Sequence, residues 1–198
     1  GRPYLVQEFL YGEDLEQILA AGTLTLPDIF EISIQLLEAL TAIHTVGLVH
    51  RDVKPENVFV LHDEFGGLRV KIVDFGIVKL KTGAVSQLTA AGSTVGTPHY
   101  MSPEQAQGQD VDGRADLWSV GVVLYEALTG RVPFDHDNPY LLLTKIVVED
   151  APPIASIRPD LPAGLAEVVD RALRRDRRER WQSADQMSRA LKEGVGRS

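Results

Sequence analysis

Apolar residues recur every three or four positions after residue 28, a spacing that predicts an amphipathic helix. Thr25 is suited to cap this helix, Pro27 fits its first turn, and Asp28 favours the positive end of its dipole. Gly47 is expected just after its last turn, where glycine is common. The apolar stripe consists of Ile29, Ile32, Leu36, Leu37, Leu40 and Ile43.

A second apolar stretch, from Asp116 to Thr129, has so few polar positions that it predicts a helix buried on most sides. Gly130 and Pro133 end it, and the segment 75–103 has no clear period. The other expected elements are helices over 14–20, 139–149, 163–174 and 183–193, a strand over 4–10, and a hairpin of 58–61 with 68–73 across Phe65-Gly66-Gly67. The predicted fold class is therefore α+β, mainly α-helical with a few short strands.

The composition is that of a folded chain, since 44% of its 198 residues are hydrophobic and 24% are charged. The absence of cysteine excludes disulfides and thiolate metal sites, and it is compatible with a cytoplasmic location. No run of about 18 apolar residues exists, so we expect no membrane segment in this chain, although a longer parent could be membrane-anchored. The net charge of −8 disfavours nucleic acid as a partner.

A basic block near the C-terminal end runs against this acidic balance. Asp170, Asp176 and Glu179 interrupt it, and only Trp181 is available for stacking on a base. We therefore interpret it as a solvated helix end with ion pairs. Its members are Arg171, Arg174, Arg175, Arg177, Arg178 and Arg180.

Three polar segments interrupt the apolar pattern: Val49–Asn57, Val73–Gly76 and Gly96–Glu104. Each alone has a structural explanation, namely a hydrogen-bonded core histidine, a tight turn and a loop. In combination, Asp52 and Asn57 lie between the long helix and the hairpin, and Asp74 follows the return strand. Such oxygen ligands suit Mg²⁺ with substrate phosphates, and phosphoryl transfer needs this set of groups.

At these motifs the chain resembles the eukaryotic-like serine/threonine protein kinases of bacteria, over essentially all 198 residues. The motifs occur in the family's order: His50-Arg51-Asp52, Lys54-Pro55-Glu56-Asn57, Asp74-Phe75-Gly76 and Ser102-Pro103-Glu104. The resemblance implies transfer of the ATP γ-phosphoryl group to Ser/Thr hydroxyls of proteins, with Mg²⁺, or Mn²⁺ in its place.

The resemblance also implies roles for individual residues. Asp52 would be the catalytic base, Lys54 would stabilise the γ-phosphoryl group, and Thr97 would hydrogen-bond both. Asn57 and Asp74 would hold the metal ions. The structural and regulatory roles would fall to His50 stacked on Phe75, to Asp116 beneath the catalytic loop, and to Glu104 paired with Arg180.

Residues 4–10 resemble the last small-lobe strand and the hinge, with Gln7 at the gatekeeper position. The implied nucleotide contacts are the backbone of Glu8 and Leu10 for adenine, Asp14 for the ribose and Phe59 beneath the purine. The segment 77–95 would be the activation segment, in which we hypothesise phosphorylation of Thr94, or of Thr89 or Ser93. Arg51 would pair with the phosphate; the alternative is an unmodified loop.

The family's Gly-rich loop, strand lysine and helix glutamate do not occur in the sequence. We therefore expect a partial kinase domain, with 1–12 as the last small-lobe strand and hinge and 13–198 as the large lobe. Such a fragment would need the missing lobe or its parent chain and would be inactive alone. It would expose apolar residues around Leu5, Phe9, Phe59 and Phe75.

Two alternatives stay open. The chain could be a catalytically inactive, kinase-like binding or scaffold module. It could also be a small-molecule phosphotransferase of the aminoglycoside-kinase type. The Asp-Phe-Gly and the segment from Thr97 to Glu104 speak against this second alternative, because such enzymes usually lack both.

Overall fold

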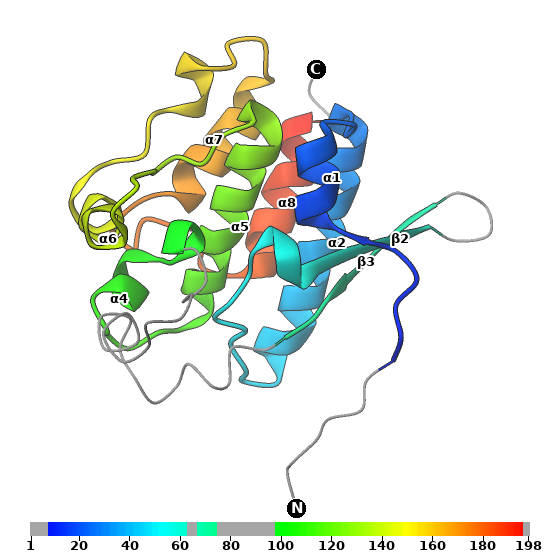
Figure 1. Cartoon of the computed structure of the whole chain (residues 1–198), viewed down its shortest axis with the longest axis horizontal. Coiled ribbons are helices and arrows are strands. Elements are labelled where there is room, and N and C mark those ends of the chain that lie inside the picture. Colours follow the sequence, from blue (N-terminus) through cyan, green and yellow to red (C-terminus); the bar gives the residue numbers. More distant parts are fainter. Residues whose placement is uncertain (1–7, 63–66, 75–97, 196–198) are drawn as a thin grey trace, which may run out of the picture.

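The computed structural model describes residues 8–62, 67–74 and 98–195. Four long helices form its body: α2 (Leu26–Thr45), α5 (Gly113–Thr129), α7 (Ala163–Ala172) and α8 (Ala184–Val195). Both α5 and α8 contact the other three, so the apolar sides of all four meet in one core (Figure 1). The mainly helical fold class is confirmed.

The predicted start of α2 is confirmed in detail. The backbone N–H of Asp28 donates to Thr25 Oγ1 at 3.4 Å, and the N–H of Thr25 donates to Asp28 Oδ2 at 2.9 Å. This reciprocal arrangement satisfies two amides at the helix start. Gly47 follows the helix with a φ of +76°, a left-handed backbone conformation that residues other than glycine rarely adopt.

The central helix α5 begins at Gly113, three residues earlier than predicted, because Asp112 caps it through the backbone N–H of Arg114. Almost its whole length is buried. A Cβ atom at Gly121 would lie 2.8 Å from Ala172 Cβ, so the missing side chain lets α5 and α7 approach closely. The other helices of the described residues are α1 (Leu15–Ala21), α4 (Pro103–Ala106) and α6 (Pro139–Val148), with 3₁₀ turns at Pro55–Asn57, Pro98–Tyr100 and Ile154–Ser156.

Three short antiparallel strands make one sheet in the order β1 (Glu13–Asp14), β2 (Val58–His62), β3 (Leu68–Ile72). The predicted hairpin is confirmed as β2 and β3, which project from the helical body (Figure 1). The predicted strand over 4–10 is wrong for residues 8–10, and 4–7 lie outside the described residues. Pairing with β2 begins only at Glu13, where the backbone reaches Val60.

Three arginines of the basic block form ion pairs at the surface, which agrees with the interpretation of the block as a solvated helix end with ion pairs. Arg175 pairs with Asp150, Arg177 with Asp112 and Arg178 with Asp176. Arg180 differs, because it is fully buried. Among the described residues, no helix combines the length and the hydrophobicity needed to cross a membrane.

Candidate active site

The segment 50–57 crosses from the end of α2 to the start of β2 and brings the first polar motif against the end of the hairpin. His50 is buried, and its Nε2 lies 3.0 Å from the carbonyl oxygen of Val73. Burial lowers the pKa of His50, while the nearby carboxylates of Asp116, Asp52 and Asp74 act in the opposite direction. The imidazole therefore lies near carboxylates from three places, namely α5, the segment 50–57 and the end of the hairpin.

Asp52 and Asn57 are joined directly. The Nδ2 group of Asn57 donates to the Asp52 carbonyl oxygen at 2.7 Å and to Asp52 Oδ2 at 3.2 Å. Asn57 is buried, so these hydrogen bonds fix the orientation of its amide. The amide oxygen of Asn57 is then the atom left to accept from, or ligate, another group.

Asp74 is connected to this pair through its neighbour Val73. The backbone N–H of Val73 donates to the Asn57 carbonyl oxygen at 2.9 Å, which extends the hairpin pairing by one step. Asp74 follows with a φ of +55°, in the left-handed region, and it is exposed. The structure therefore brings Asp52, Asn57 and Asp74 to one end of the hairpin.

Asp116 holds the backbone of the loop from the first turn of α5. Its Oδ2 accepts the N–H of His50 at 2.9 Å, and its Oδ1 accepts the N–H of Arg51 at 2.8 Å. His44 Nε2 also lies 2.8 Å from Asp116 Oδ2. Arg51 has a φ of +67°, and its buried Nε has no hydrogen-bond partner within the described part of the chain.

Glu104 and Arg180 form a buried bidentate ion pair, with distances of 2.8 and 2.9 Å. Arg180 also donates to the carbonyl oxygens of Arg174, Arg114 and Arg175. The guanidinium lies 4.9 Å from the centre of the Trp118 ring. The pair connects α4 to the segment between α7 and α8, which are distant in sequence.

The sheet presents a second face away from the core. Phe59 lies opposite Asp14 on β1 and opposite Lys71 on β3, so these three side chains share that face, while Val58 and Val60 face the core. Asp14 caps α1, and its carboxylate accepts two hydrogen bonds from Gln17. Glu8 pairs with Lys71 Nζ at 2.5 Å, and Leu10 lies between Glu8 and the sheet in sequence, outside any strand.

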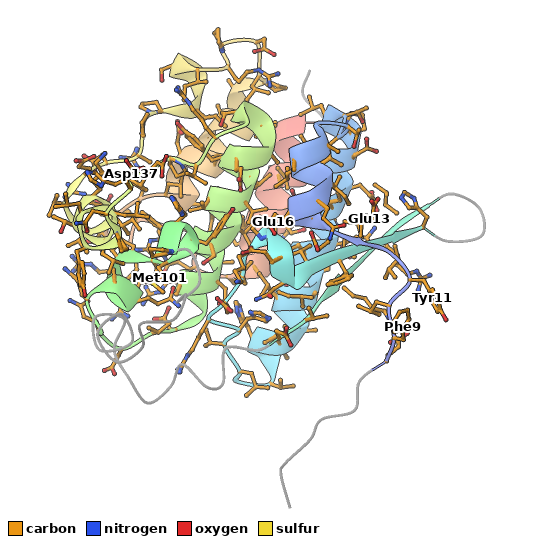
Figure 2. The ribbon with its side chains drawn as sticks, viewed as in Figure 1. Phe9, Tyr11, Glu13, Glu16, Met101 and Asp137 are labelled. Atoms are coloured by element: carbon orange, nitrogen blue, oxygen red, sulfur yellow. The ribbon has the colours of Figure 1, made fainter. Side chains whose placement is uncertain are left out.

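The apolar surface expected along this edge is present in part. Phe9 is 75% exposed, Tyr11 is 83% exposed, and their rings contact edge-to-face. Figure 2 shows both side chains on the segment that leads into β1, away from the helical body. Phe59 is half-buried, and Leu5 and Phe75 lie outside the described residues.

Lys54 lies in the same loop, and its Nζ is 3.4 Å from Glu56 Oε1. The structure therefore places this cation beside a carboxylate of its own loop, two residues away. Other expected site residues lie outside the described ranges: Gln7, Phe75, Thr89, Ser93, Thr94 and Thr97.

Our sequence interpretation missed two polar connections around the site. Tyr100 donates its hydroxyl to Glu126 Oε2 at 2.6 Å, and burial raises the pKa of both groups. Gln105 donates from Nε2 to the Arg51 carbonyl oxygen at 2.8 Å. The pattern Ser102-x-x-Gln105 is a capping-box signature that could have drawn attention to Gln105, whereas nothing local indicates its contact with Arg51.

A family profile described as the protein kinase domain matches residues 1–191. The chain belongs to the protein kinase family. Serine/threonine-protein kinase Pkn1 of Myxococcus xanthus is 41% identical over 194 residues, which are 96% of this chain and 27% of Pkn1. The probable serine/threonine-protein kinase PknB of Bifidobacterium longum is 37% identical over 185 residues, 93% of this chain and 26% of that protein.

Solved structures agree with this assignment. The crystal structure of the Mycobacterium tuberculosis PknI kinase domain is similar with a TM-score of 0.71 and 28% identity, over 94% of this chain and 64% of that domain. The chain thus spans about a quarter of the curated relatives and about two thirds of a solved kinase domain. The relatives place it among the bacterial eukaryotic-like Ser/Thr kinases and favour this assignment over a small-molecule phosphotransferase.

Proposed function

We propose that this chain carries the catalytic loop and metal-binding side chains of an ATP-dependent protein serine/threonine kinase. The observation that supports this most strongly is the hydrogen-bonded pair of Asp52 and Asn57, connected through Val73 to Asp74. Phosphoryl transfer requires a positioned carboxylate next to metal-binding oxygens. These three residues come from two separate motifs. A purely structural explanation would need a different cause for each motif, whereas a shared site accounts for both.

In the proposed reaction, the hydroxyl oxygen of a substrate Ser or Thr forms a bond to the γ-phosphorus. The bond from that phosphorus to the leaving ADP oxygen breaks, and the hydroxyl proton passes to Asp52. Asn57 holds Asp52 in orientation through the hydrogen bond to Oδ2. The Lys54 ammonium group would break its ion pair with Glu56 and stabilise the γ-phosphoryl group. Thr97 would hydrogen-bond Asp52 and Lys54.

The donor atoms suit a hard cation such as Mg²⁺ or Mn²⁺, since Asp74 offers a carboxylate and Asn57 an amide oxygen. No cluster of three or more His, Asp or Glu side chains suited to a metal occurs in the described ranges. The remaining ligands would therefore be water and ATP phosphate oxygens, as is common for Mg²⁺. When bound, the metal would neutralise phosphate charge.

We assign the nucleotide base to the face of the sheet that bears Phe59. Asp14 would meet the ribose, and the backbone of Glu8 and Leu10 would meet adenine. Phe59 is half-buried on the face that does not join the core, so its ring is available to an aromatic ligand.

Because the proposed reaction consumes ATP, we propose that this chain acts in the cytoplasm.

We infer further roles for the groups around the loop. Asp116 supports the backbone of His50 and Arg51, and the Glu104–Arg180 pair anchors α4. His50 would stack on Phe75, as the family resemblance implies. The unpartnered Nε of Arg51 suits a phosphate, so we propose phosphorylation of Thr94, or of Thr89 or Ser93, as the regulatory event.

We also propose that the 198 residues alone transfer phosphate negligibly. The Gly-rich loop and strand lysine that cover the phosphates do not occur among them, and positioning supplies most of the rate in phosphoryl transfer. The test compares this chain with a chimera in which it follows the small lobe of Pkn1. We expect ³²P transfer to a protein substrate from the chimera only.

Variants of the chimera then test the assigned roles. Asp52→Asn and Asp74→Asn should each abolish transfer, and Asp74→Asn should weaken Mg·ATP binding more. Asp137→Asn, at an exposed position before α6, is the matched control and should change neither (Figure 2). Equal nucleotide affinity of the two site variants would contradict the roles, and a folded chimera that neither binds ATP nor transfers phosphate would favour a scaffold module.

A further inference from the structure

The peptide group between Arg51 and Asp52 is held in place from a distant part of the chain. Its carbonyl oxygen, on Arg51, accepts a hydrogen bond from Gln105 Nε2 at 2.8 Å. Its N–H, on Asp52, points to His50 Nδ1 at 3.3 Å. Rotation of this peptide plane would move Asp52 directly, so whatever fixes the plane also fixes Asp52.

Arg51 needs such support because its backbone is strained. A φ of +67° lies in the left-handed region, which a residue with a long side chain occupies only when its surroundings impose it. Asp116 Oδ1 holds the N–H on one side of the Arg51 Cα, and Gln105 holds the carbonyl on the other. The two contacts together define both peptide planes of the strained residue.

Gln105 acts from a fixed position. It is the third residue of α4, and its Oε1 accepts the N–H of Ser102 at 3.0 Å while Ser102 Oγ accepts the N–H of Gln105 at 3.4 Å. The preceding residue, Glu104, is locked to the buried Arg180. The Gln105 amide therefore bridges two backbones, with its oxygen on the start of α4 and its nitrogen on the catalytic loop.

The residue type separates these two tasks. Either glutamate or glutamine can accept the N–H of Ser102 in a capping box, so capping alone does not require an amide. Only glutamine can also donate to the carbonyl of Arg51, because an ionised carboxylate has no donor. Glutamine at this position therefore makes both contacts, whereas glutamate could make only the first.

We propose that Gln105 is a positioning residue, which holds the Arg51–Asp52 peptide in the orientation that presents Asp52 for phosphoryl transfer. Its importance for catalysis rests on the proposed function of Asp52, whereas its effect on the loop backbone does not. The effect on the backbone can be measured in the 198-residue chain itself.

The decisive variant is Gln105→Glu, which keeps the cap of α4 and removes the donor to Arg51. Amide hydrogen exchange followed by NMR should show the Asp52 N–H exchanging at least tenfold faster, and the ¹³C resonance of the Arg51 carbonyl should shift. The amides of α4 should keep their exchange rates. Gln105→Met, which loses both hydrogen bonds, should accelerate the amides of α4 as well.

Gln35 offers a matched control, because both the oxygen and the nitrogen of its amide hydrogen-bond backbone groups, here two residues of the single strand β3. Its Nε2 donates to the Leu68 carbonyl at 2.9 Å, and its Oε1 accepts the N–H of Val70 at 2.9 Å. Gln35→Glu makes the same chemical change at the edge of β3 and should leave the Asp52 amide unaffected. Unchanged exchange at Asp52 in Gln105→Glu, or an equal acceleration in both glutamate variants, would overturn the proposal.

A kinetic comparison in the Pkn1 chimera separates this proposal from the proposed function. With an active chimera, Gln105→Glu should lower kcat at least tenfold and change the KM for ATP less than twofold, because Asp52 acts on the transfer step. An unchanged kcat would overturn the catalytic importance of Gln105. If the unsubstituted chimera shows no transfer, the proposed function fails, and the exchange experiment still decides the role of Gln105 in the loop.

Discussion

The loop of residues 50–57 lies between a region whose charged side chains are buried and a region whose charged side chains are exposed. Beneath it, the side chains of Arg180, Asp116 and Glu104 are 0%, 1% and 5% exposed, and each is hydrogen-bonded to backbone or to an opposite charge. Beside it, the edge formed by residues 8–14 and the outer face of the sheet holds its charges in water. Lys71 and Glu8 pair there with 39% and 69% of their side chains exposed.

The difference indicates which region sets the geometry of the site. A buried charge is tolerated only in a fully paired arrangement, so removal of one partner is costly and the arrangement is rigid. An exposed pair contributes little and can rearrange. We infer that the buried region fixes the loop, whereas the open edge adapts to what binds there.

The largest effect is expected from breaking the Glu104–Arg180 pair. Arg180→Met leaves Glu104 buried without its cation and should lower the free energy of unfolding by about 3–5 kcal/mol in urea titrations. Arg178→Met, in the same basic block but with its ion pair at the surface, should lower the free energy of unfolding far less. Equal losses would remove the distinction between the two regions; if Arg180→Met does not fold, Glu104→Gln provides the same comparison.

A smaller loss is expected from Asp116→Asn. The variant keeps one oxygen for the two loop amides of His50 and Arg51, so one of them loses its acceptor, at a cost of about 2 kcal/mol. Asp112→Asn, four residues earlier, keeps a good N-cap and loses only partly exposed ion pairs with Arg114 and Arg177, at about 1 kcal/mol or less. Denaturant unfolding of both variants measures the difference, and a greater loss in Asp112→Asn would contradict it.

The pH dependence of stability should reveal the buried His50. Burial lowers its pKa below the ordinary value of 6.5, so below pH 6.5 the unfolded chain binds a proton that the folded chain resists. The free energy of unfolding should therefore fall as the pH drops through 6.5 towards the lower pKa of the folded state. His50→Gln should flatten this part of the curve; identical slopes for the two proteins would show that His50 does not carry it.

The smallest effect is expected at the open edge. Lys71→Met removes the exposed pair with Glu8 and should change the free energy of unfolding by about 0.2–1 kcal/mol. Any difference should shrink in 1 M NaCl, where the screening length is about 3 Å. A loss as large as that of Arg180→Met would mean that this edge is as rigid as the buried region.

Local sequence signals predicted most of the helical fold. Thr25, Pro27 and Asp28 mark the start of α2 because capping depends on neighbours within a few residues, and the apolar run of α5 reflects burial on most sides. The strand expected over 4–10 was wrong in its described part, because a strand exists only where a partner backbone is within reach. The early start of α5 followed from a cap at Asp112 that the apolar pattern does not include.

For the candidate site, the motifs predicted which residues belong to it, but they predicted little about the contacts between those residues. The order of the motifs along the chain was enough to select Asp52, Asn57 and Asp74 as candidates. In the structure, Asp52 and Asn57 lie next to the end of the hairpin that carries Asp74, as that order predicts. The role of Gln105 could not be named, because its partner Arg51 lies 54 residues away. The capping function of the Asp14 carboxylate was also missed, since its expected role came from the family resemblance alone.

The amino-acid sequence by itself determined most of the helices, the hairpin, the kinase family and which residues are candidates for the site, because these depend on periodicity, caps and motif order. Only the tertiary structure decided which backbone each polar side chain holds. Asp116, Gln105 and Arg180 act on segments 54 to 76 residues away. Such contacts form because buried polar groups must find partners wherever folding brings them, and that requirement is met in space rather than along the chain.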